Sequence, residues 1–340
     1  MPKTLRRVQE LRRRHLVKAH SLAFAVLALA PHLHLCAQAQ TASYPTKPIR
    51  LLVGAPAGGP TDVIARSLIQ QMGNSLGQPL VIENRGGAAG TIAAGVVAKS
   101  PADGYMLIVT PSAHAYAPSM YDKLPFDPVK DFRPIGQIGM MPLVAIANKA
   151  LPADTLREVA DRAKERPNAV NYGSSGRGSA HHLAGELFKV RTGIQMTHVP
   201  YKGSAASITD LIAGQIQVIF EPLVSALPQI QAGRVKALAV MGEKRSPALP
   251  DVPKPREGGV PGVEASAWYG IMAPAGTPDI AFTRLNAALN KALADPGTRA
   301  TLQAQGVEVT PGPPQMFMDL IASEIARWKP IIQAAGIRAE

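Results

Sequence analysis

Residues 49–76 read IRLLVGAPAGGPTDVIARSLIQQMGNSL, a short apolar run followed by a loop of small residues and an amphipathic stretch. The run Ile49–Val53 has the length and composition of a buried strand. Beyond the loop, apolar residues recur at every fourth position from Ile64 to Leu76, which places them on one face of a helix. The stretch therefore predicts one strand–loop–helix unit of an α/β fold.

The same pattern recurs three times further along the chain. The predicted strands and their loops are Tyr105–Val109 with 110–114, Ala169–Tyr172 with 173–178, and Met196–Pro200 with 201–204. A helix is predicted from Ser179, with Leu183, Leu187 and Val190 on its buried face, and another passes through Ile208 and stops at Gly214. Alternating strands and helices predict parallel sheets, in which ligands bind beyond the carboxyl ends of the strands.

The length of 340 residues suits two domains or one large one. Two stretches rich in Pro or Gly, Pro125–Pro142 and Ser246–Gly262, are typical of crossings between domains. We therefore predict a discontinuous first lobe, residues 44–143 and 247–340, and a second lobe, residues 144–246. Apolar residues at helical spacing between Phe317 and Ile332 predict a last helix that packs on the core.

The first 39 residues have the organisation of a signal peptide. They hold seven basic residues and one acidic residue, then an apolar run from Ser21 to Ala30, and they end in Ala37-Gln38-Ala39, where we expect cleavage. The run is too short to anchor the chain in a bilayer. Arg13-Arg14 resembles a twin-arginine export signal, and an ordinary Sec signal is the alternative. Either route predicts a periplasmic protein.

Removal of this segment changes how the charge and the cysteine count are interpreted. The formal charge of +12 falls to +6, because 29 basic and 23 acidic residues remain, and they form no basic run. Nucleic acid is therefore not an expected partner. The only cysteine, Cys36, is lost as well, so disulfides, cysteine-ligated metals and a cysteine nucleophile are excluded from the mature chain.

The loops that open into helices are suited to binding an anion. Small residues at a helix start leave backbone N–H groups unpaired, and the helix dipole adds partial positive charge there. In the first loop, the spacing of Gly54 and Gly59 resembles a P-loop, but Pro60 replaces the lysine that would reach a phosphate. Asp62, in the first helical turn, either satisfies the helix start or contacts the ligand.

Several side chains near these loops have both a structural and a functional interpretation. His181 and His182 are adjacent, so they cannot share a helix face for a metal. His182 lies three residues after Ser179, which suits either capping and packing or contact with a ligand carboxylate. Lys202 and Glu221 are either solvated charges or ligand contacts. A Ser-His-Asp triad of a serine, His182 and Asp210 has no supporting spacing.

Eight motifs in order resemble one known family. They are Tyr44-Pro45 with Pro48-Ile49-Arg50, PAGGPTD at 56–62, Glu83-Asn84-Arg85, Pro101–Tyr105, NYGSSGRGSAHHL at 171–183, HVPYKG at 198–203, LPDVP at 249–253 and APAGTP at 273–278. The chain resembles the Bug receptors, the periplasmic solute-binding proteins of tripartite tricarboxylate transporters. This resemblance covers essentially the whole mature chain and implies a type II periplasmic-binding-protein fold, with two α/β lobes that close on a small carboxylate.

The resemblance also implies where the ligand is held and what the protein lacks. Ligand contacts are expected, mostly through loop backbone groups and ordered water, at Ala57, Gly58, Gly59, Asp62, Ser112, Ser174, Ser175, Ser179, His182, Tyr201, Lys202 and Gly203, and the residues themselves add Glu221. No cofactor and no metal are expected. The chain departs from the family at Gly54-Ala55, where Pro-Phe is common, at Gly86, where Pro is common, and at Glu221, where Asp is common. Without a ring at position 55, that wall of the cleft is expected to be wider.

Two functions follow from these observations. The first is a monomeric, non-enzymatic receptor that captures a small organic anion and presents it to a membrane transporter or a sensor. The second is a secreted hydrolase that uses a serine and a histidine in the same cleft. Turnover of ester or amide substrates would separate them.

Overall fold

The computed structural model describes residues 44–338, so the predicted signal peptide lies outside the described residues. The elements up to residue 165 are β1 (Ile49–Val53), α2 (Pro60–Leu76), β2 (Leu80–Asn84), the 3₁₀ turn η2 (Ala88–Gly90), α3 (Thr91–Ala98), β3 (Met106–Pro111), α4 (Ala113–Met120), β4 (Phe132–Asn148) and α5 (Leu156–Glu165). Those up to residue 240 are β5 (Asn171–Ser174), α6 (Ala180–Thr192), β6 (Thr197–Pro200), α7 (Ser204–Ile212), β7 (Val218–Pro222), α8 (Leu223–Gln231) and β8 (Val235–Val240). The last are β9 (Ser266–Pro274), α9 (Asp279–Ala294), α10 (Pro296–Ala304), β10 (Glu308–Val309) and α11 (Pro314–Ala334).

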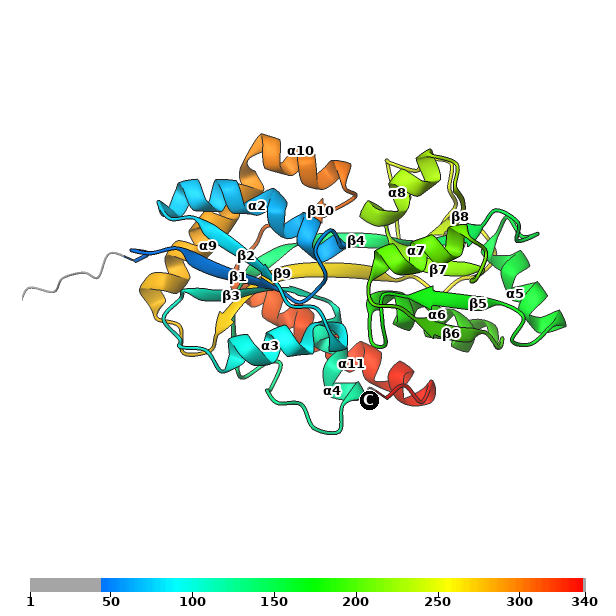
Figure 1. Cartoon of the computed structure of the whole chain (residues 1–340), viewed down its shortest axis with the longest axis horizontal. Coiled ribbons are helices and arrows are strands. Elements are labelled where there is room, and N and C mark those ends of the chain that lie inside the picture. The colour runs from blue at the N-terminus through cyan, green and yellow to red at the C-terminus, as the bar shows by residue number, and fades with distance from the viewer. Residues whose placement is uncertain (1–43, 339–340) are drawn as a thin grey trace, which may run out of the picture. The chain divides into compact units, whose positions relative to one another are not determined.

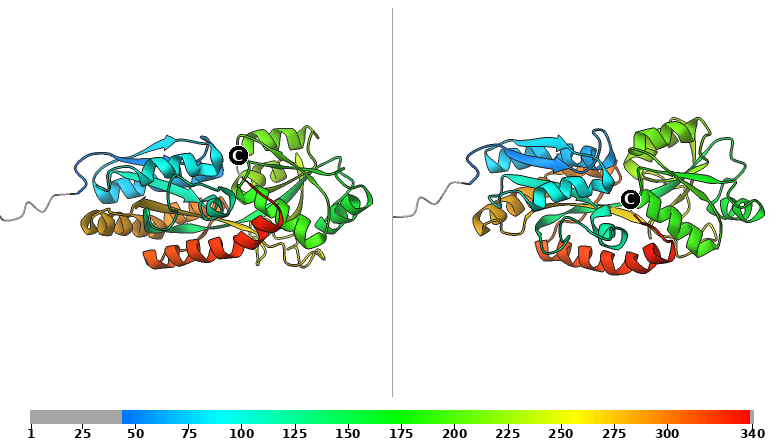
Figure 2. Two further views of the ribbon diagram at one scale, coloured as in Figure 1. Left: turned by 90° about the horizontal axis from the view of Figure 1, so that it is seen from below. Right: turned by 60° about the horizontal axis from the view of Figure 1, so that its bottom comes forward.

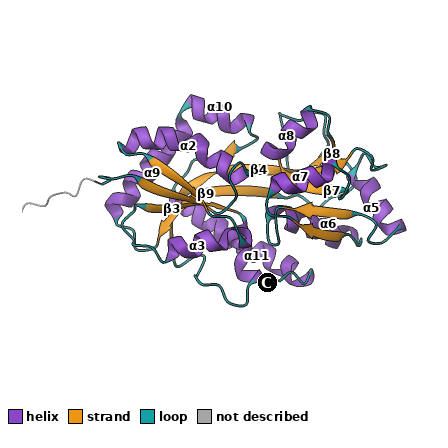
Figure 3. Cartoon of the chain, in the orientation of Figure 1, coloured by secondary structure: helices purple, strands orange, loops and turns teal. Residues whose placement is uncertain are grey.

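The strands form two parallel groups, as the repeated strand–loop–helix pattern predicts. β1 pairs in parallel with β2 and β3, and β5 pairs in parallel with β6 and β7. The strand order is β2-β1-β3-β9-β4-β7-β5-β6, with β8 and β10 both paired to β4. Helices lie along the strands in both groups (Figure 3). The mixed α/β class is therefore confirmed.

The two groups are joined by β4, which is a long strand where the prolines predicted an irregular crossing. It runs for 17 residues, pairs first with β9 from Phe132 to Pro142, and then with β7 from Leu143 onward (Figure 1). A strand tolerates proline where ladder hydrogen bonds are interrupted. Pro134 sits at a register shift of the ladder, and Pro142 is the last partner of β9.

The amphipathic patterns place most helices correctly. In α2, the predicted face of Ile64, Leu68, Met72 and Leu76 is buried, and the helix ends at Gly77, which adopts the left-handed conformation. In α6, Leu183 and Leu187 are buried, but Val190 is 47% exposed, so its predicted burial is wrong. The reason is its place in the last turn, beyond the final buried residue of that helix.

The C-terminal helix α11 packs on the core, as its apolar spacing predicts. Phe317, Ile321, Trp328 and Ile332 are buried, and the indole N–H of Trp328 donates to Glu324 at 3.0 Å. This helix contacts α4 and β4 and also reaches α6 of the second group (Figure 2). Among residues 44–338, no helix combines the length and the apolar character that a membrane span requires.

Candidate ligand-binding site

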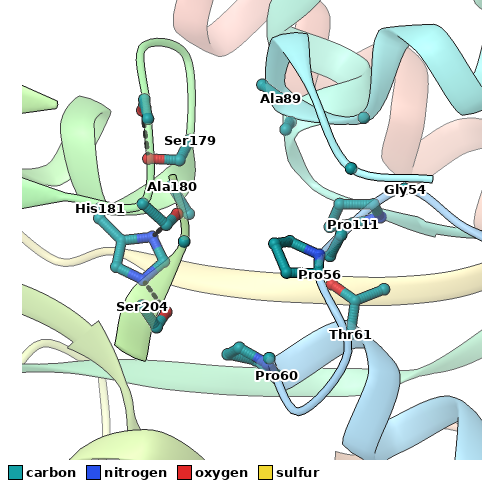
Figure 4. A pocket seen from close by; sticks show the side chains of 18 of the residues that line it. Gly54, Pro56, Pro60, Thr61, Ala89, Pro111, Ser179, Ala180, His181 and Ser204 are labelled. Carbon is teal, nitrogen blue, oxygen red and sulfur yellow. Dashed lines mark hydrogen bonds between the residues drawn. The ribbon is translucent and has the colours of Figure 1, made fainter. Parts of the chain in front are cut away.

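A cavity of about 890 Å³ opens where the loops at the strand ends meet, within the size range of small-molecule sites. Its wall consists of five loop segments together with Tyr121, Pro222, Ala267 and Tyr269; the segments fall within residues 54–61, 84–90, 111–113, 175–181 and 201–205. Figure 4 shows Ser179, His181 and Ser204 on one side of this cavity and Pro56, Thr61 and Ala89 on the other. The sequence pattern thus predicted the correct edge of the sheet.

Several helices begin at the wall of this cavity. The residues before α2, α3, α4 and α7 are Gly59, Gly90, Ser112 and Gly203, and none of them caps its helix with a side chain. Among the described helices that begin at this wall, only α6 is capped by a side chain, because Ser179 accepts from the backbone N–H of His182. Uncapped helix starts combine free N–H donors with the positive end of the helix dipole. The wall is therefore suited to an anion.

Asp62 supports the first loop and does not line the cavity. It is buried, and it accepts from Gly58 N at 2.8 Å, from Arg66 Nε at 2.9 Å and from Asn84 Nδ2 at 3.0 Å. Burial pushes the pKa of Asp62 upward, but the hydrogen bonds from Arg66, Gly58 and Asn84 outweigh burial and hold the pKa below its usual value. An ionised Asp62 therefore ties the loop to β2 and to the first turn of α2.

The run Gly86–Gly90 forms a further part of the wall that sequence reasoning had noted only for its missing proline. Positive φ angles occur at Gly87, Ala88, Ala89 and Gly90, and alanine rarely adopts this conformation. The turn is held against the first loop, since a Cβ added at Gly54 would lie 2.9 Å from the Gly90 Cα. A signal was present, because this glycine-rich run follows a strand and opens into a helix like the loops that were recognised.

On the opposite side, His181 and not His182 reaches the cavity. Its Nδ1 lies 3.0 Å from Ser175 Oγ, and its Nε2 lies 3.2 Å from Ser204 Oγ and 3.1 Å from Glu221 Oε2. Ser175, His181 and Ser204 all line the cavity. Successive residues of a helix point about 100° apart, so only one of two adjacent histidines can face the ligand. Residue spacing left open which one it would be.

His182 belongs to a buried cluster behind this wall. Its Nδ1 accepts from the backbone N–H of Gly178 at 3.1 Å, and its ring stacks on His198, which lies 2.7 Å from Ser174 Oγ. Burial and then the neighbouring positive charge of Arg177 lower the pKa of His182 to about 3. Burial lowers the pKa of His198 to about 3 as well. Both rings are therefore neutral near pH 7, and they position the loop that carries Ser175.

The predicted contact residues thus divide into two sets. The residues on the cavity wall are Ala57, Gly59, Ser112, Ser175, Ser179, Tyr201, Lys202 and Gly203. The residues outside the wall are Gly58, Asp62, Ser174, His182 and Glu221. The wall also includes residues that were not predicted, and those with polar side chains are Thr61, Asn84, Tyr121, Arg177, His181, Ser204 and Tyr269.

Ser112 has an unused hydrogen-bonding group at this wall. Its side chain is fully buried, and although the Tyr116 hydroxyl lies nearby, Oγ makes no hydrogen bond of normal geometry. By contrast, the Tyr201 hydroxyl donates to Asp210 at 2.7 Å. Burial and this bond raise the pKa of Tyr201 to about 12, so the ring stays neutral. A buried hydroxyl without a partner is costly, so Ser112 Oγ is a candidate for pairing with a bound ligand.

No cluster of three or more metal-ligating side chains occurs within residues 44–338. The charged side chains on the cavity wall are Arg177 and Lys202. The site therefore offers backbone N–H groups, hydroxyls and positive charge, a combination typical of sites that bind an organic anion.

Comparison with known proteins identifies the family. Residues 64–337 match the model of the tripartite tricarboxylate transporter family receptor. The chain belongs to this family. It is 34% identical to the periplasmic binding protein BugD. The match covers 87% of this chain and 100% of BugD, and the two structures superpose with a TM-score of 0.82.

Two other solved relatives were determined with a ligand. Rpa4515 from R. palustris, with adipate, is 38% identical; the match covers 87% of this chain and 99% of that chain, and the TM-score is 0.83. MatC from Rhodopseudomonas palustris, with bound malate, is 34% identical; the match covers 85% of this chain and 100% of that chain, and the TM-score is 0.81. The two-lobed periplasmic-binding-protein fold and the resemblance to the Bug receptors are confirmed. The family consists of solute-binding receptors rather than enzymes, and nothing in these comparisons supports the hydrolase alternative.

Proposed function

We propose that this receptor binds a small dicarboxylate in the cavity between its two lobes, and that it does not convert it. The observation that carries this proposal is the convergence of four uncapped helix starts with the unpartnered hydroxyl of Ser112. The proteins with adipate and malate support the ligand class, since both compounds are dicarboxylates. Backbone N–H groups recognise the carboxylate ends, whereas wall side chains read what lies between them.

The lobes of this proposal are residues 44–143 with 247–340, and residues 144–246. The backbone supports crossings near the first boundary and near or after the second, because Leu143 N donates to Ala265 O, Ala265 N to Met241 O and Met241 N to Leu143 O. We place the crossings between the lobes at these three residues. Across the cavity the lobes approach at Pro56 and Gly203, because a Cβ at Gly203 would lie 3.2 Å from Pro56 Cγ. Closure about the crossings would bring these loops onto the ligand.

The remaining parts of the proposal concern the setting of the protein. Residues 1–39 direct export to the periplasm, where the loaded receptor, as a monomer, meets a membrane transporter or a sensor. The family membership and the periplasmic relative BugD support this setting.

Native mass spectrometry of the purified protein, followed by calorimetry with C4 to C6 dicarboxylates, tests the proposal. We expect a retained or titratable dicarboxylate bound at one to one, and weaker binding by Ser112→Ala with unchanged folding. Ester and amide substrates should show no turnover. Turnover that a Ser175→Ala or His181→Gln change abolishes would instead identify a hydrolase, and failure of every dicarboxylate to bind would refute the ligand class.

A further inference from the structure

Glu221 is a buried carboxylate without a hydrogen bond, placed behind a cavity that is suited to anions. It lies at the end of β7 with 0% of its surface exposed, and neither Oε1 nor Oε2 has a hydrogen-bond partner. Within residues 44–338, its ion-pair partner is His181, whose Nε2 lies 3.1 Å from Oε2 in a direction outside hydrogen-bond geometry. A buried carboxylate that is not paired costs several kcal/mol. His181 is therefore the group that can compensate the negative charge of Glu221.

The position of Glu221 next to the cavity has independent support. Tyr269 lines the cavity, and its pKa is raised first by burial and then by the negative charge of Glu221. The next residue, Pro222, also forms part of the wall. The charge of Glu221 thus acts on the cavity even though its side chain lies behind the surface.

The surroundings of His181 give its two ring nitrogens different roles. Nε2 lies in hydrogen-bond geometry to Ser204 Oγ, which can accept, and 3.1 Å from Glu221 Oε2, whose negative charge favours a proton on Nε2. Nδ1 faces Ser175 Oγ at 3.0 Å, and a hydroxyl can either accept or donate. Nδ1 is therefore the nitrogen whose surroundings allow it to be either protonated or unprotonated.

The Nδ1 proton determines what Ser175 presents to a ligand. When Nδ1 is protonated, it donates to Ser175 Oγ, and the hydroxyl hydrogen of Ser175 is free to donate into the cavity. When Nδ1 is not protonated, it accepts that hydrogen, and Ser175 turns only lone pairs toward the cavity. The first state suits a carboxylate, and the second suits a ligand group that donates a hydrogen bond.

We propose that the Glu221–His181 pair is a specificity device that couples carboxylate binding to the uptake of one proton at His181 Nδ1. This inference rests on the proposed function. With the proton absent, the pair carries a net negative charge beside an anionic ligand, and Ser175 offers no donor. With the proton present, the pair is neutral and Ser175 donates, so a ligand carboxylate and the proton stabilise each other's binding.

The other charged and titratable groups around His181 do not replace this role. Arg177, from the loop before α6, and Lys202, from the loop before α7, lie on the cavity wall and contribute positive charge in both states. Tyr269, from β9, stays neutral because burial and Glu221 raise its pKa. His182 on the same helix faces His198 and Gly178. The Nδ1 proton is thus the change that alters both the charge and the donor pattern of this wall.

Nitrogen NMR of histidine-labelled protein, free and with adipate or malate, tests the assignment. We expect the His181 ring to carry its proton on Nε2 when the site is empty, and to carry protons on both nitrogens when the ligand carboxylate is bound. Glu221→Gln should abolish the preference for Nε2. Glu324→Gln, a buried carboxylate in α11 outside the cavity, should not change the His181 signals. Absence of the Nε2 proton from the empty site, or a ring that does not change when the ligand binds, would overturn the proposal.

Calorimetry with adipate and malate then tests the coupling. Measured in two buffers of different ionisation enthalpy at about pH 8, the wild type should take up close to one proton per bound probe. Its Kd should rise by up to about tenfold per pH unit on the alkaline side. Glu221→Gln and His181→Gln should each remove most of this dependence. Binding of the probes without proton uptake overturns the coupling but leaves the receptor function standing, whereas absence of binding at every pH refutes the proposed ligand class.

Discussion

The rings of His182 and His198 lie face to face, with their centroids 3.8 Å apart and an angle of 13° between their planes. Two imidazolium ions could not occupy this position, because their charges would repel each other in a buried site. The stack is therefore a neutral support for the loop of Ser174 and Ser175. Its stability, and hence that of the ligand-binding wall, depends on pH.

The first prediction is a loss of stability in mild acid. Burial lowers the pKa of His182 and His198 to about 3 and that of His114 to about 4, below the usual 6.5. The unfolded chain binds these protons below about pH 6.5 and the folded chain does not, so stability falls as the pH drops toward 4. Each ring contributes a slope of up to about 1.4 kcal/mol per pH unit. Urea unfolding at pH 7 and pH 5 measures this slope.

The buried carboxylate of Asp62 does not obscure this test. The pKa of Asp62 lies below 3.8, so the stability that it contributes is present at pH 5 and is lost only in stronger acid. A His198→Gln variant should show a shallower slope than the wild type. Equal unfolding free energies for the wild type at pH 7 and pH 5 would contradict the neutral stack.

The second prediction separates two adjacent serines. Ser175→Ala should weaken dicarboxylate binding by about 1 to 2 kcal/mol, since this hydroxyl lies on the cavity wall. Ser174→Ala should cost about 1 kcal/mol of folding free energy and change binding little, because its hydroxyl pairs with His198 behind the wall. Calorimetry and urea unfolding of both variants measure the two effects. If Ser174→Ala impaired binding more than Ser175→Ala, the placement of the wall would be wrong.

The third prediction concerns Asp62 as a support for the first loop. Asp62→Ala should cost about 1 to 3 kcal/mol of folding free energy, because it leaves the Gly58 N–H and the Asn84 amide without the acceptor that holds the loop. Arg66→Ala removes an exposed partner and should cost less than about 1 kcal/mol. Chemical unfolding compares the two. A smaller loss for Asp62→Ala than for Arg66→Ala would show that the carboxylate is not the element that holds this loop.

The fourth prediction uses two glycines inside helices. A Cβ at Gly185 in α6 would lie 2.2 Å from the buried ring of Tyr172, so Gly185→Ala should destabilise the protein by about 1 to 3 kcal/mol through overpacking. A Cβ at Gly73 in α2 meets only ordinary contacts from 3.4 Å outward, so Gly73→Ala should stabilise it by about 0.5 to 1 kcal/mol. Thermal unfolding should shift in opposite directions, and shifts of the same sign would contradict the packing around Tyr172.

The sequence by itself was sufficient for the α/β class, the parallel strand groups and the edge at which the cavity opens. Local properties explain this success. Apolar periodicity identified α2 and the buried positions of α11, and small residues between a strand and a helix identified the loops before α2, α6 and α7. These signals depend on residues close together in the chain, where backbone geometry alone decides the outcome.

Tertiary structure decided the details on which recognition depends. It selected His181 over His182 for the cavity wall, because the packing of α6 against β7 sets the rotation of the helix. It made Asp62, in α2, a support for the first loop through a hydrogen bond from Asn84, which lies in β2. It also made a continuous strand of Phe132–Asn148 despite its prolines, since β9 and β7 supply the pairing partners. Each outcome depends on residues far apart in the chain, whose contacts form only when the whole domain packs.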